Sequence, residues 1–320
     1  MNKPTRLEIF PDELFLELFS YILPVELCHT WHGLNARFNA VLRSVRISFD
    51  LYEHSDAATH ALNHFAQQTV YIHLHSYYAS LNLKQFPNLR SLAIDVKPTD
   101  EQIDCIRPQI LPQLERLTFS VWWTSSEPLS ELIFSTHPHE KNFVQLKVYH
   151  LPSLPKYFTR IVSKLYHIQT MILDRVTAMD IHIILSVLVY LRRLKVTVVT
   201  GMSDVSHPSH PPLHQQLVEL DITMNTFSKL DDLYRLFPRL AGLRHLHVAC
   251  DSLTESDFRQ LAGHLHTHIP WLHRLNCSFK QTHVDDIQVL HSMSPLFRRM
   301  ACRKVVWVGD WYYHCVTTQN

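Results

Sequence analysis

Apolar residues recur along most of the chain in one pattern, with two residues between the first and second positions and one before the third. Leu89-x-x-Leu92-x-Ile94 is the first clear example. The central residues of these units are Leu92, Leu117, Leu146, Met171, Leu194, Leu220, Leu246 and Leu275. They follow one another at intervals of 23 to 29 residues, which is enough chain for a short strand and a helix. The pattern predicts an α/β fold in which parallel strands alternate with helices.

The residues beside each central position are mostly polar, whereas the anchor positions are mostly apolar. Because successive side chains of a strand point to opposite faces, we expect Leu220 to be buried and Asp221 to be exposed. Helical segments are expected at residues 178–190, 227–237 and 257–266. Thr254 and Asp257 have the spacing of an N-terminal capping box. Weaker strands are expected at residues 45–49, 70–74 and 304–307.

The first 45 residues predict three short helices. In the first of them, residues 10–22, Leu14, Leu18 and Tyr21 recur at three- and four-residue steps and form an apolar stripe. The second and third helices are expected at residues 25–31 and 35–42. So short a segment cannot bury all of these apolar side chains by itself, which implies a partner or a neighbouring domain. A helical cap on the strands that follow is the alternative.

Charge and composition narrow the function classes. The 30 basic and 29 acidic residues give a net charge of +1, so nothing draws the whole chain to nucleic acid or to an anionic membrane. Six scattered cysteines without a Cys-x-x-Cys pair, and an N-terminus without an apolar signal core, favour a soluble cytoplasmic or nuclear protein. The longest apolar stretch, residues 181–191, is well short of the ~20 residues that a membrane helix needs.

The N-terminal segment Phe10-Pro11-x-Glu13-Leu14-x-Leu16-Glu17-Leu18-Phe19-Ser20-Tyr21-Ile22-x-Pro24-x-Glu26-Leu27, followed by Leu34-Asn35-x-Arg37-Phe38-Asn39, resembles an F-box. In that family the module docks onto a Skp-type adaptor, which bridges to a cullin-based ubiquitin ligase. The resemblance implies adaptor contacts at or near Pro11, Leu14, Leu18, Tyr21, Pro24 and Leu27. Phe10 replaces the family's common leucine, and Gly33-Leu34-Asn35 departs from the family's usual stretch before the third helix.

The repeated units resemble leucine-rich repeats, whose period is about 20–29 residues. The asparagine typical of regular repeats occurs only at Asn225, so the units are leucine-rich-repeat-like. The resemblance implies an F-box-like module over residues 1–45 and a leucine-rich-repeat-like solenoid over residues 46–320. The last repeat would need a C-terminal cap. The aromatic residues that we expect to form this cap, or alternatively to anchor a ligand, are Trp307, Trp311, Tyr312 and Tyr313.

A substrate surface is expected on the polar face of the strands. Arg116, Lys147, Arg193 and Lys195 would form a basic stripe there, suited to an acidic or phosphorylated protein ligand. An ordinary solvated face is the alternative, and the sequence does not separate the two. Aromatic residues beyond the strands could also anchor a ligand. They are Trp122, Trp123 and Tyr149.

The sequence contains no recognisable catalytic or cofactor-binding motif. The five glycines are too far apart to cradle a phosphate. The densest histidine groups, His207-x-x-His210 with His214 and His264-x-His266-x-His268, lack a complete ligand set, so we expect no metal site. We therefore expect a non-enzymatic subunit of a cullin-type ligase, with a Skp-family adaptor and an unknown protein substrate as partners. A scaffold of the same architecture that acts outside any ligase is the alternative.

Overall fold

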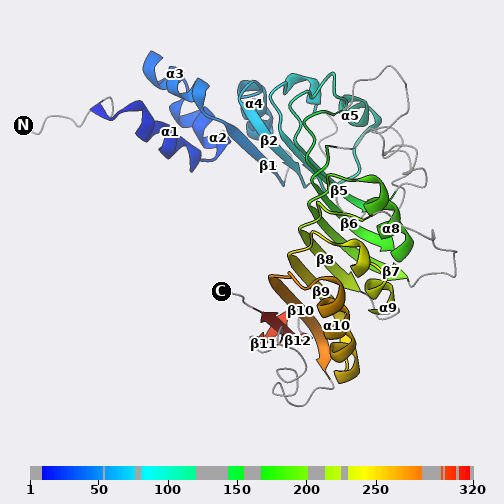
Figure 1. Cartoon of the computed structure of the whole chain (residues 1–320). Coiled ribbons are helices and arrows are strands. Elements are labelled where there is room, and N and C mark those ends of the chain that lie inside the picture. The colour runs from blue at the N-terminus through cyan, green and yellow to red at the C-terminus, as the bar shows by residue number, and fades with distance from the viewer. Residues whose placement is uncertain are drawn as a thin grey trace, which may run out of the picture. The chain divides into compact units, whose positions relative to one another are not determined.

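The computed structural model (Figure 1) describes residues 9–52, 55–75, 81–119, 143–154, 167–200, 213–224, 230–282, 297, 300–307 and 310–317. The chain divides into two compact units, Met1–Leu146 and Lys147–Asn320. In each unit, parallel strands follow one another in chain order with helices between them. This arrangement confirms the predicted α/β class.

Helices open the first unit. They are α1 (Asp12–Ser20), α2 (Pro24–Glu26), the π-helical segment η2 (Leu27–Trp31) and α3 (Ala36–Ser44). Asn35 starts α3 because its side chain accepts a hydrogen bond from the backbone N–H of Phe38. Phe15, Phe19 and Phe38 are buried, and the ring centroids of Phe15 and Phe38 are 4.9 Å apart. With Trp31, whose ring lies 5.0 Å from that of Phe19, they form an aromatic core between these helices.

In the described part of the first unit, four parallel strands follow the helices: β1 (Ile47–Leu51), β2 (Thr69–Leu74), β3 (Ser91–Ile94) and β4 (Arg116–Phe119). The helices between them are α4 (Asp56–His64), η3 (Leu83–Gln85) and α5 (Asp100–Cys105). Buried and exposed residues alternate along β1, with Phe49 buried and Asp50 exposed. The strand expected at residues 70–74 is confirmed as β2, and the strand expected at residues 45–49 is present two residues later, as β1.

Among the described residues of the second unit, six strands of the sheet run parallel: β5 (Val148–Ser153), β6 (Thr170–Thr177), β7 (Arg193–Thr200), β8 (Glu219–Met224), β9 (His245–Leu253) and β10 (Arg274–Thr282). Figure 1 shows α8 (Ala178–Val187), α9 (Leu230–Tyr234) and α10 (Glu255–His268) along one side of this sheet. A short helix, η5 (Phe237–Arg239), follows α9. The capping box predicted at Thr254 and Asp257 begins α10.

A recurring pair of hydrogen bonds fixes the register between neighbouring strand–helix repeats. The carbonyl of Arg192, two residues before the central Leu194, accepts the N–H groups of both Val218 and Glu219, at 2.8 and 3.0 Å. The same double acceptance occurs at the carbonyls of Arg90, Lys147, Gln169, Val218 and Arg244. This pairing sets Leu194 directly beside Leu220. The predicted central positions are confirmed at Leu92, Leu117, Met171, Leu194, Leu220, Leu246 and Leu275.

The predicted register is wrong in one unit. Tyr149, not Leu146, lies beside the central Met171, and Tyr149 is fully buried. Leu146 takes the first anchor position of its strand–helix repeat. The carbonyl of the next residue, Lys147, accepts the N–H groups of Gln169 and Thr170 in the following repeat, as the carbonyl after the first anchor does elsewhere. Tyr149 therefore belongs to the core. The expectation that it could anchor a ligand is wrong, because its side chain is fully buried.

The late strand was also predicted in the wrong arrangement. β11 (Met300–Trp307) does not extend the parallel series but pairs antiparallel with β12 (Asp310–Thr317). β12 in turn pairs antiparallel with β10, so a hairpin covers the edge that β10 would otherwise present to solvent. Within the described ranges, no helix is long and apolar enough to cross a bilayer.

The alternation of faces predicts a large difference between two adjacent residues. Leu220 is 0% exposed, so Leu220→Asp would bury an unpaired charge and should cost more than about 4 kcal/mol of unfolding free energy. The side chain of Asp221 is 22% exposed and pairs with His247 and Lys195, so it is less exposed than the sequence predicted. Asp221→Ala should cost about 1 kcal/mol. Urea denaturation of the full chain measures both values, and equal losses would contradict the register.

Candidate functional site

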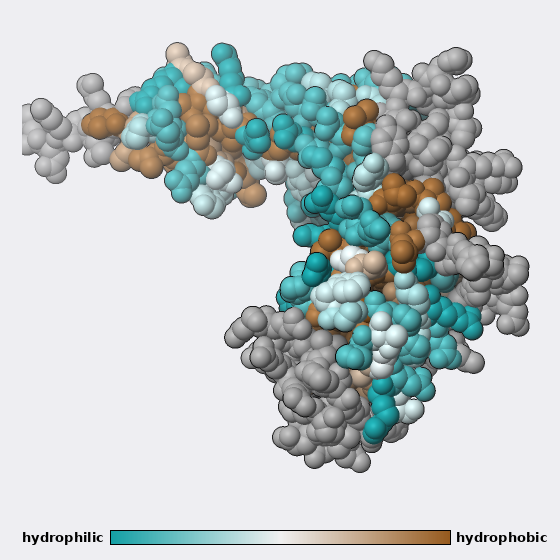
Figure 2. Space-filling view, in the orientation of Figure 1, coloured by the Kyte–Doolittle hydropathy of each residue, from teal (hydrophilic) through white to brown (hydrophobic). Residues whose placement is uncertain are grey.

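Helix α1 carries two apolar stripes, and only one of them is buried. Phe15 and Phe19 face the aromatic core, while Leu14, Leu18 and Tyr21 remain 49%, 44% and 80% exposed. Leu23, at 65% exposure, follows them. We call Leu14, Leu18, Tyr21 and Leu23 the exposed apolar stripe. Figure 2 shows hydrophobic side chains at the surface of these N-terminal helices.

The remaining residues that resemblance assigned to an adaptor contact are placed less uniformly. Pro11 is exposed and Pro24 is half-buried. Leu27 is 1% exposed, just after α2, which packs against α4 and β1. Leu27 is therefore a packing residue of the first unit and, as placed, is closed to a partner, which corrects the expectation for this position.

Arg37 ties the third helix to the first. Its Nε donates a 2.8 Å hydrogen bond to Oδ1 of Asp12, and its Nη2 donates a 2.6 Å bond to the carbonyl of Phe10. The guanidinium also lies 5.8 Å from the centre of the Phe15 ring. These contacts hold α1 and α3 together, so the exposed apolar stripe is carried on a packed helical base.

The four basic residues predicted to form one stripe are not equivalent in the structure. Arg116 is exposed on β4 of the first unit, and the other three belong to the second. Lys147 precedes β5 and occupies the ladder position of Arg192, not the position of Arg193 or Lys195. Its predicted alignment with Arg193 and Lys195 is therefore wrong, for the same reason that the register around Tyr149 was wrong.

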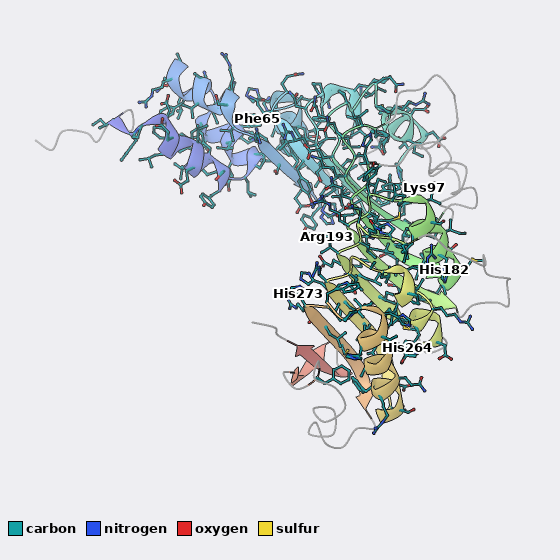
Figure 3. All side chains as sticks on the ribbon, in the orientation of Figure 1. Phe65, Lys97, His182, Arg193, His264 and His273 are labelled. Atoms are coloured by element: carbon teal, nitrogen blue, oxygen red, sulfur yellow. The ribbon has the colours of Figure 1, made fainter. Side chains whose placement is uncertain are left out.

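Acidic residues of the next strand accompany the two remaining basic residues. Arg193 lies 3.1 Å from a carboxylate oxygen of Glu219, and Lys195 lies 3.7 Å from one of Asp221. Figure 3 labels Arg193 on one side of the sheet and His182, in α8, on the other. This surface is a set of paired charges whose most exposed members are basic, at 68% for Arg193 and 61% for Lys195.

Asp221 pairs with two side chains of this surface, Lys195 and His247. Burial alone raises the pKa of its carboxyl group, but a hydrogen bond and the charge of His247, together with Lys195, outweigh burial and hold the pKa below its ordinary value of 3.8. Nδ1 of His247 lies 2.9 Å from Oδ1 of Asp221. The carboxylate is therefore stabilised in its charged form.

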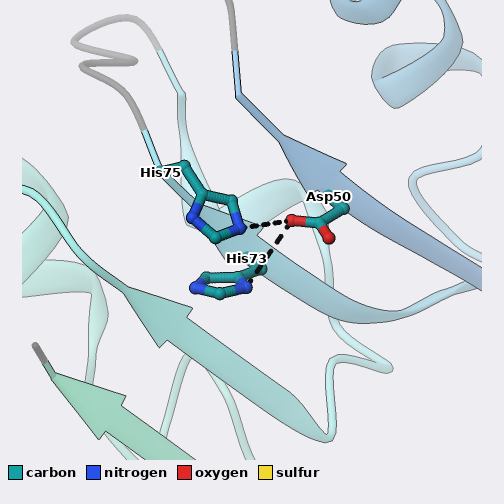
Figure 4. Close-up of side chains that lie close together, drawn as sticks. All are labelled: Asp50, His73 and His75. Atoms are coloured by element: carbon teal, nitrogen blue, oxygen red, sulfur yellow. Dashed lines mark ion pairs between the residues drawn. The ribbon is translucent and has the colours of Figure 1, made fainter. Parts of the chain in front are cut away.

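A compact group of acidic and imidazole side chains, which sequence reasoning missed, lies at the carboxyl ends of β1, β2 and β3 (Figure 4). Oδ1 of Asp50 is 3.5 Å from Nδ1 of His73 and 2.7 Å from Nε2 of His75. The opposite ring nitrogens, Nε2 of His73 and Nδ1 of His75, are 3.0 and 2.9 Å from Oδ2 of Asp95. We call Asp50, His73, His75 and Asp95 the His–Asp cluster. The alternation of His73-x-His75 in a strand was the available signal, because both side chains must share a face.

The histidine groups singled out in the sequence are not part of the His–Asp cluster. His207 and His210 lie outside the described residues, and His214 is buried between two backbone groups, the carbonyl of Leu188 and the N–H of Leu217. Burial lowers the pKa of His214, which suits a neutral structural imidazole. In α10, the rings of His264 and His268 stack 6.0 Å apart, and His266 is exposed. Trp122 and Trp123, and the side chains of Trp307, Trp311, Tyr312 and Tyr313, lie outside what the structure describes.

A pocket of about 570 Å³ lies between η3 and α5 in the first unit. Its lining combines Lys84 and Arg107 with Glu101 and Asp104, and Arg107 is bound to Asp104 at 2.7 Å. These charges are mutually balanced, so the pocket suggests no particular ligand.

Asp221 should make stability depend on pH in the acid range. A carboxyl group whose folded pKa is depressed stabilises the fold above its unfolded pKa, and that contribution disappears as pH falls through the folded pKa. Asp221→Asn should therefore lower the unfolding free energy near pH 7, and its difference from wild type should shrink below about pH 4. Urea denaturation between about pH 7 and pH 3 measures the difference. A difference that stays constant over this range would contradict the role given to the carboxylate.

Comparison of the chain with models of known protein families finds no match. A comparison with curated proteins likewise finds none.

Proposed function

We propose that this chain is the substrate-recognition subunit of a cullin-type ubiquitin ligase. Its N-terminal helices act as an F-box-like module that binds a Skp-type adaptor. Its strand–helix units act as a leucine-rich-repeat-like solenoid that binds a protein substrate. Because one chain joins the two sites, the substrate is held near the ubiquitin donor at a high effective concentration.

The exposed apolar stripe is the observation that carries this proposal. Burying one such side chain is worth about 1.5–3 kcal/mol, so the free protein leaves several kcal/mol to be gained from a partner. Leu14, Leu18 and Tyr21 of the stripe are also positions at which the F-box resemblance implies an adaptor contact. Physical exposure and sequence resemblance therefore support the same surface.

The alternative that these helices only cap the strands fits the structure less well. A cap would bury its apolar surface against the sheet it covers. Leu27 is buried on the side where α2 meets α4 and β1, whereas Leu14 and Leu18 are exposed. The helices thus use one face for the fold and keep a second apolar face in solvent.

The polar face of the second unit is the proposed substrate surface. Arg193 and Lys195 are 68% and 61% exposed, while their partners Glu219 and Asp221 are 45% and 22% exposed. Basic groups therefore extend furthest into solvent, which favours an acidic or phosphorylated segment of a substrate. Arg116, which precedes the central Leu117 as Arg193 precedes Leu194, remains a predicted contributor in the first unit. Lys147 remains a predicted contributor from a position outside the strand register of Arg193 and Lys195.

A scaffold that acts outside any ligase is the second candidate, and it would use the same polar face. The two candidates differ in what binds the exposed apolar stripe. Co-purification of a Skp-type adaptor together with a cullin supports the ligase subunit. An adaptor-free complex supports the scaffold.

The exposed apolar stripe predicts the outcome of a double substitution. Leu14→Ala with Leu18→Ala should weaken binding to a purified Skp-type adaptor about a thousandfold, because two buried interface anchors commonly cost about 2 kcal/mol each. Leu213→Ala is a matched control, since Leu213 is an exposed leucine (61%) of the second unit. Titration calorimetry with the full chain measures the affinities. Wild-type protein that ignores micromolar adaptor would remove the ligase proposal.

The polar face predicts a second, separable loss. Arg193→Glu with Lys195→Glu should reduce substrate capture, because the reversed charges would join Glu219 and Asp221 in a wholly acidic patch. Adaptor binding should not change, since the stripe lies in the other unit. Proximity labelling in cells compares the labelled proteins, with Arg192→Glu as the control because Arg192 is an exposed arginine just before β7. An unchanged substrate set in the double variant would reject this surface.

A further inference from the structure

The His–Asp cluster combines groups that metal ions prefer, on the polar face of the first unit. Asp50 and His73 are direct neighbours across β1 and β2, and His75 follows β2 on the same face. In the next strand the residue beside His73 is Ala93, whose small side chain leaves room for the imidazole rings. One ligand atom from each of Asp50, His73 and His75 lies within 4.8 Å of the others.

Asp95 sets the orientation of the two imidazoles. Nε2 of His73 makes a 3.0 Å hydrogen bond with Oδ2 of Asp95, and Nδ1 of His75 lies 2.9 Å from the same oxygen. A carboxylate accepts hydrogen bonds, so Asp95 favours the tautomer in which these two nitrogens carry the protons. The lone pairs of the opposite nitrogens, Nδ1 of His73 and Nε2 of His75, then face Asp50. A carboxylate behind each imidazole is the arrangement by which proteins orient histidine ligands of a metal ion.

The side of the cluster near Asp50 favours a positive charge, carried either by a proton or by a metal ion. Nε2 of His75 is only 2.7 Å from Oδ1 of Asp50, yet this buried nitrogen has no hydrogen-bond partner among the described residues. In the neutral tautomer a lone pair and a carboxylate oxygen at that separation repel one another, and the repulsion is relieved either by a second proton on the imidazole or by a cation that both groups bind.

We propose that Asp50, His73 and His75 bind a divalent transition-metal ion, of which zinc is the representative, with Asp95 as the supporting carboxylate. Zinc bonds to nitrogen and oxygen are about 2.0–2.2 Å long and tetrahedrally arranged, so two ligands of one ion are about 3.4 Å apart. The 3.5 Å separation between Asp50 and His73 matches this distance, and the 2.7 Å separation between Asp50 and His75 would widen by about 0.7 Å when an ion binds between them.

Two imidazoles and one carboxylate match zinc and iron chemistry better than that of magnesium or calcium, which prefer oxygen ligands. Three protein ligands leave at least one coordination position for water or for a donor from a bound molecule. Tyr52 stacks on His75 with its ring centroid 4.0 Å away and an interplanar angle of 5°, and it is 62% exposed. The site is therefore open to solvent on the polar face.

Zinc titration of the chelator-treated full chain tests this proposal. Wild-type protein should bind Zn²⁺ in titration calorimetry near neutral pH, and His73→Ala with His75→Ala should abolish the tight phase. Asp95→Asn should weaken binding about 10–100-fold, the usual effect of removing a supporting carboxylate. Asp50→Asn should also lose affinity, and because Asp50 is 51% exposed, this variant should fold even if the double histidine variant does not.

His150→Ala is the matched control. His150 also faces an acidic partner, Asp174, at 3.0 Å, and it has the same 21% exposure as His75, but it comes from β5 of the other unit. Its loss should change the zinc affinity less than twofold. Wild-type protein without micromolar zinc affinity would overturn the proposal. So would affinity that survives Asp50→Asn unchanged, because the ion would then be held elsewhere.

Discussion

The in-register pairing of successive parallel strands is the constraint on which the rest of this structure depends. Among the described residues, a single carbonyl before six of the central residues accepts two N–H groups of the next strand–helix repeat, as Arg192 does for Val218 and Glu219. Once that bond is made, alternation decides which side chains are buried. Leu194 and Leu220 then pack side by side in the core, while Lys195 and Asp221 meet on the opposite face.

The same constraint gathers chemistry from distant parts of the sequence. Asp50 and His73 are adjacent because β1 and β2 pair in register, and Asp221 meets His247 because β8 and β9 do. Charged and imidazole side chains thus face one another in rows on the polar face, where each strand supplies the partner of the next. The N-terminal helices follow a different logic, since their aromatic core leaves an apolar stripe in solvent.

Much of the fold was predictable because apolar spacing reports the phase of a strand directly. Central positions such as Leu92 and Leu246, and the cap at Thr254, needed only local sequence. Leu146 misled because a leucine fits either the first or the central anchor, and the tyrosine at position 149 gave no sign that it would fill the core. The strand predicted at residues 304–307 was expected to continue the parallel series, but it pairs antiparallel with β12. The composition of this segment suits a parallel or an antiparallel strand equally well.

The candidate sites were less predictable, for physical reasons. Whether a basic side chain has an acidic partner depends on which residue of the next strand lies beside it. The pairing of Arg193 with Glu219 therefore follows from the register of β7 and β8, and neither strand's sequence reveals it alone. The His–Asp cluster combines two weakly predicted strands with the clear one around Leu92, and the alignment of the two weak strands could not be set in advance. By contrast, Leu14 and Leu18 could be singled out because helical spacing shows them on a stripe separate from Phe15 and Phe19.

Hydrogen–deuterium exchange of the full chain, with and without a purified Skp-type adaptor, tests the proposed function most directly. Amide exchange slows where binding buries or stabilises a segment. We expect adaptor-dependent protection over α1 to η2, residues 12–31, with β5 to β10 unchanged. Protection confined to the strands of the second unit, or none at saturating adaptor, would contradict the proposal that the exposed apolar stripe is the docking surface.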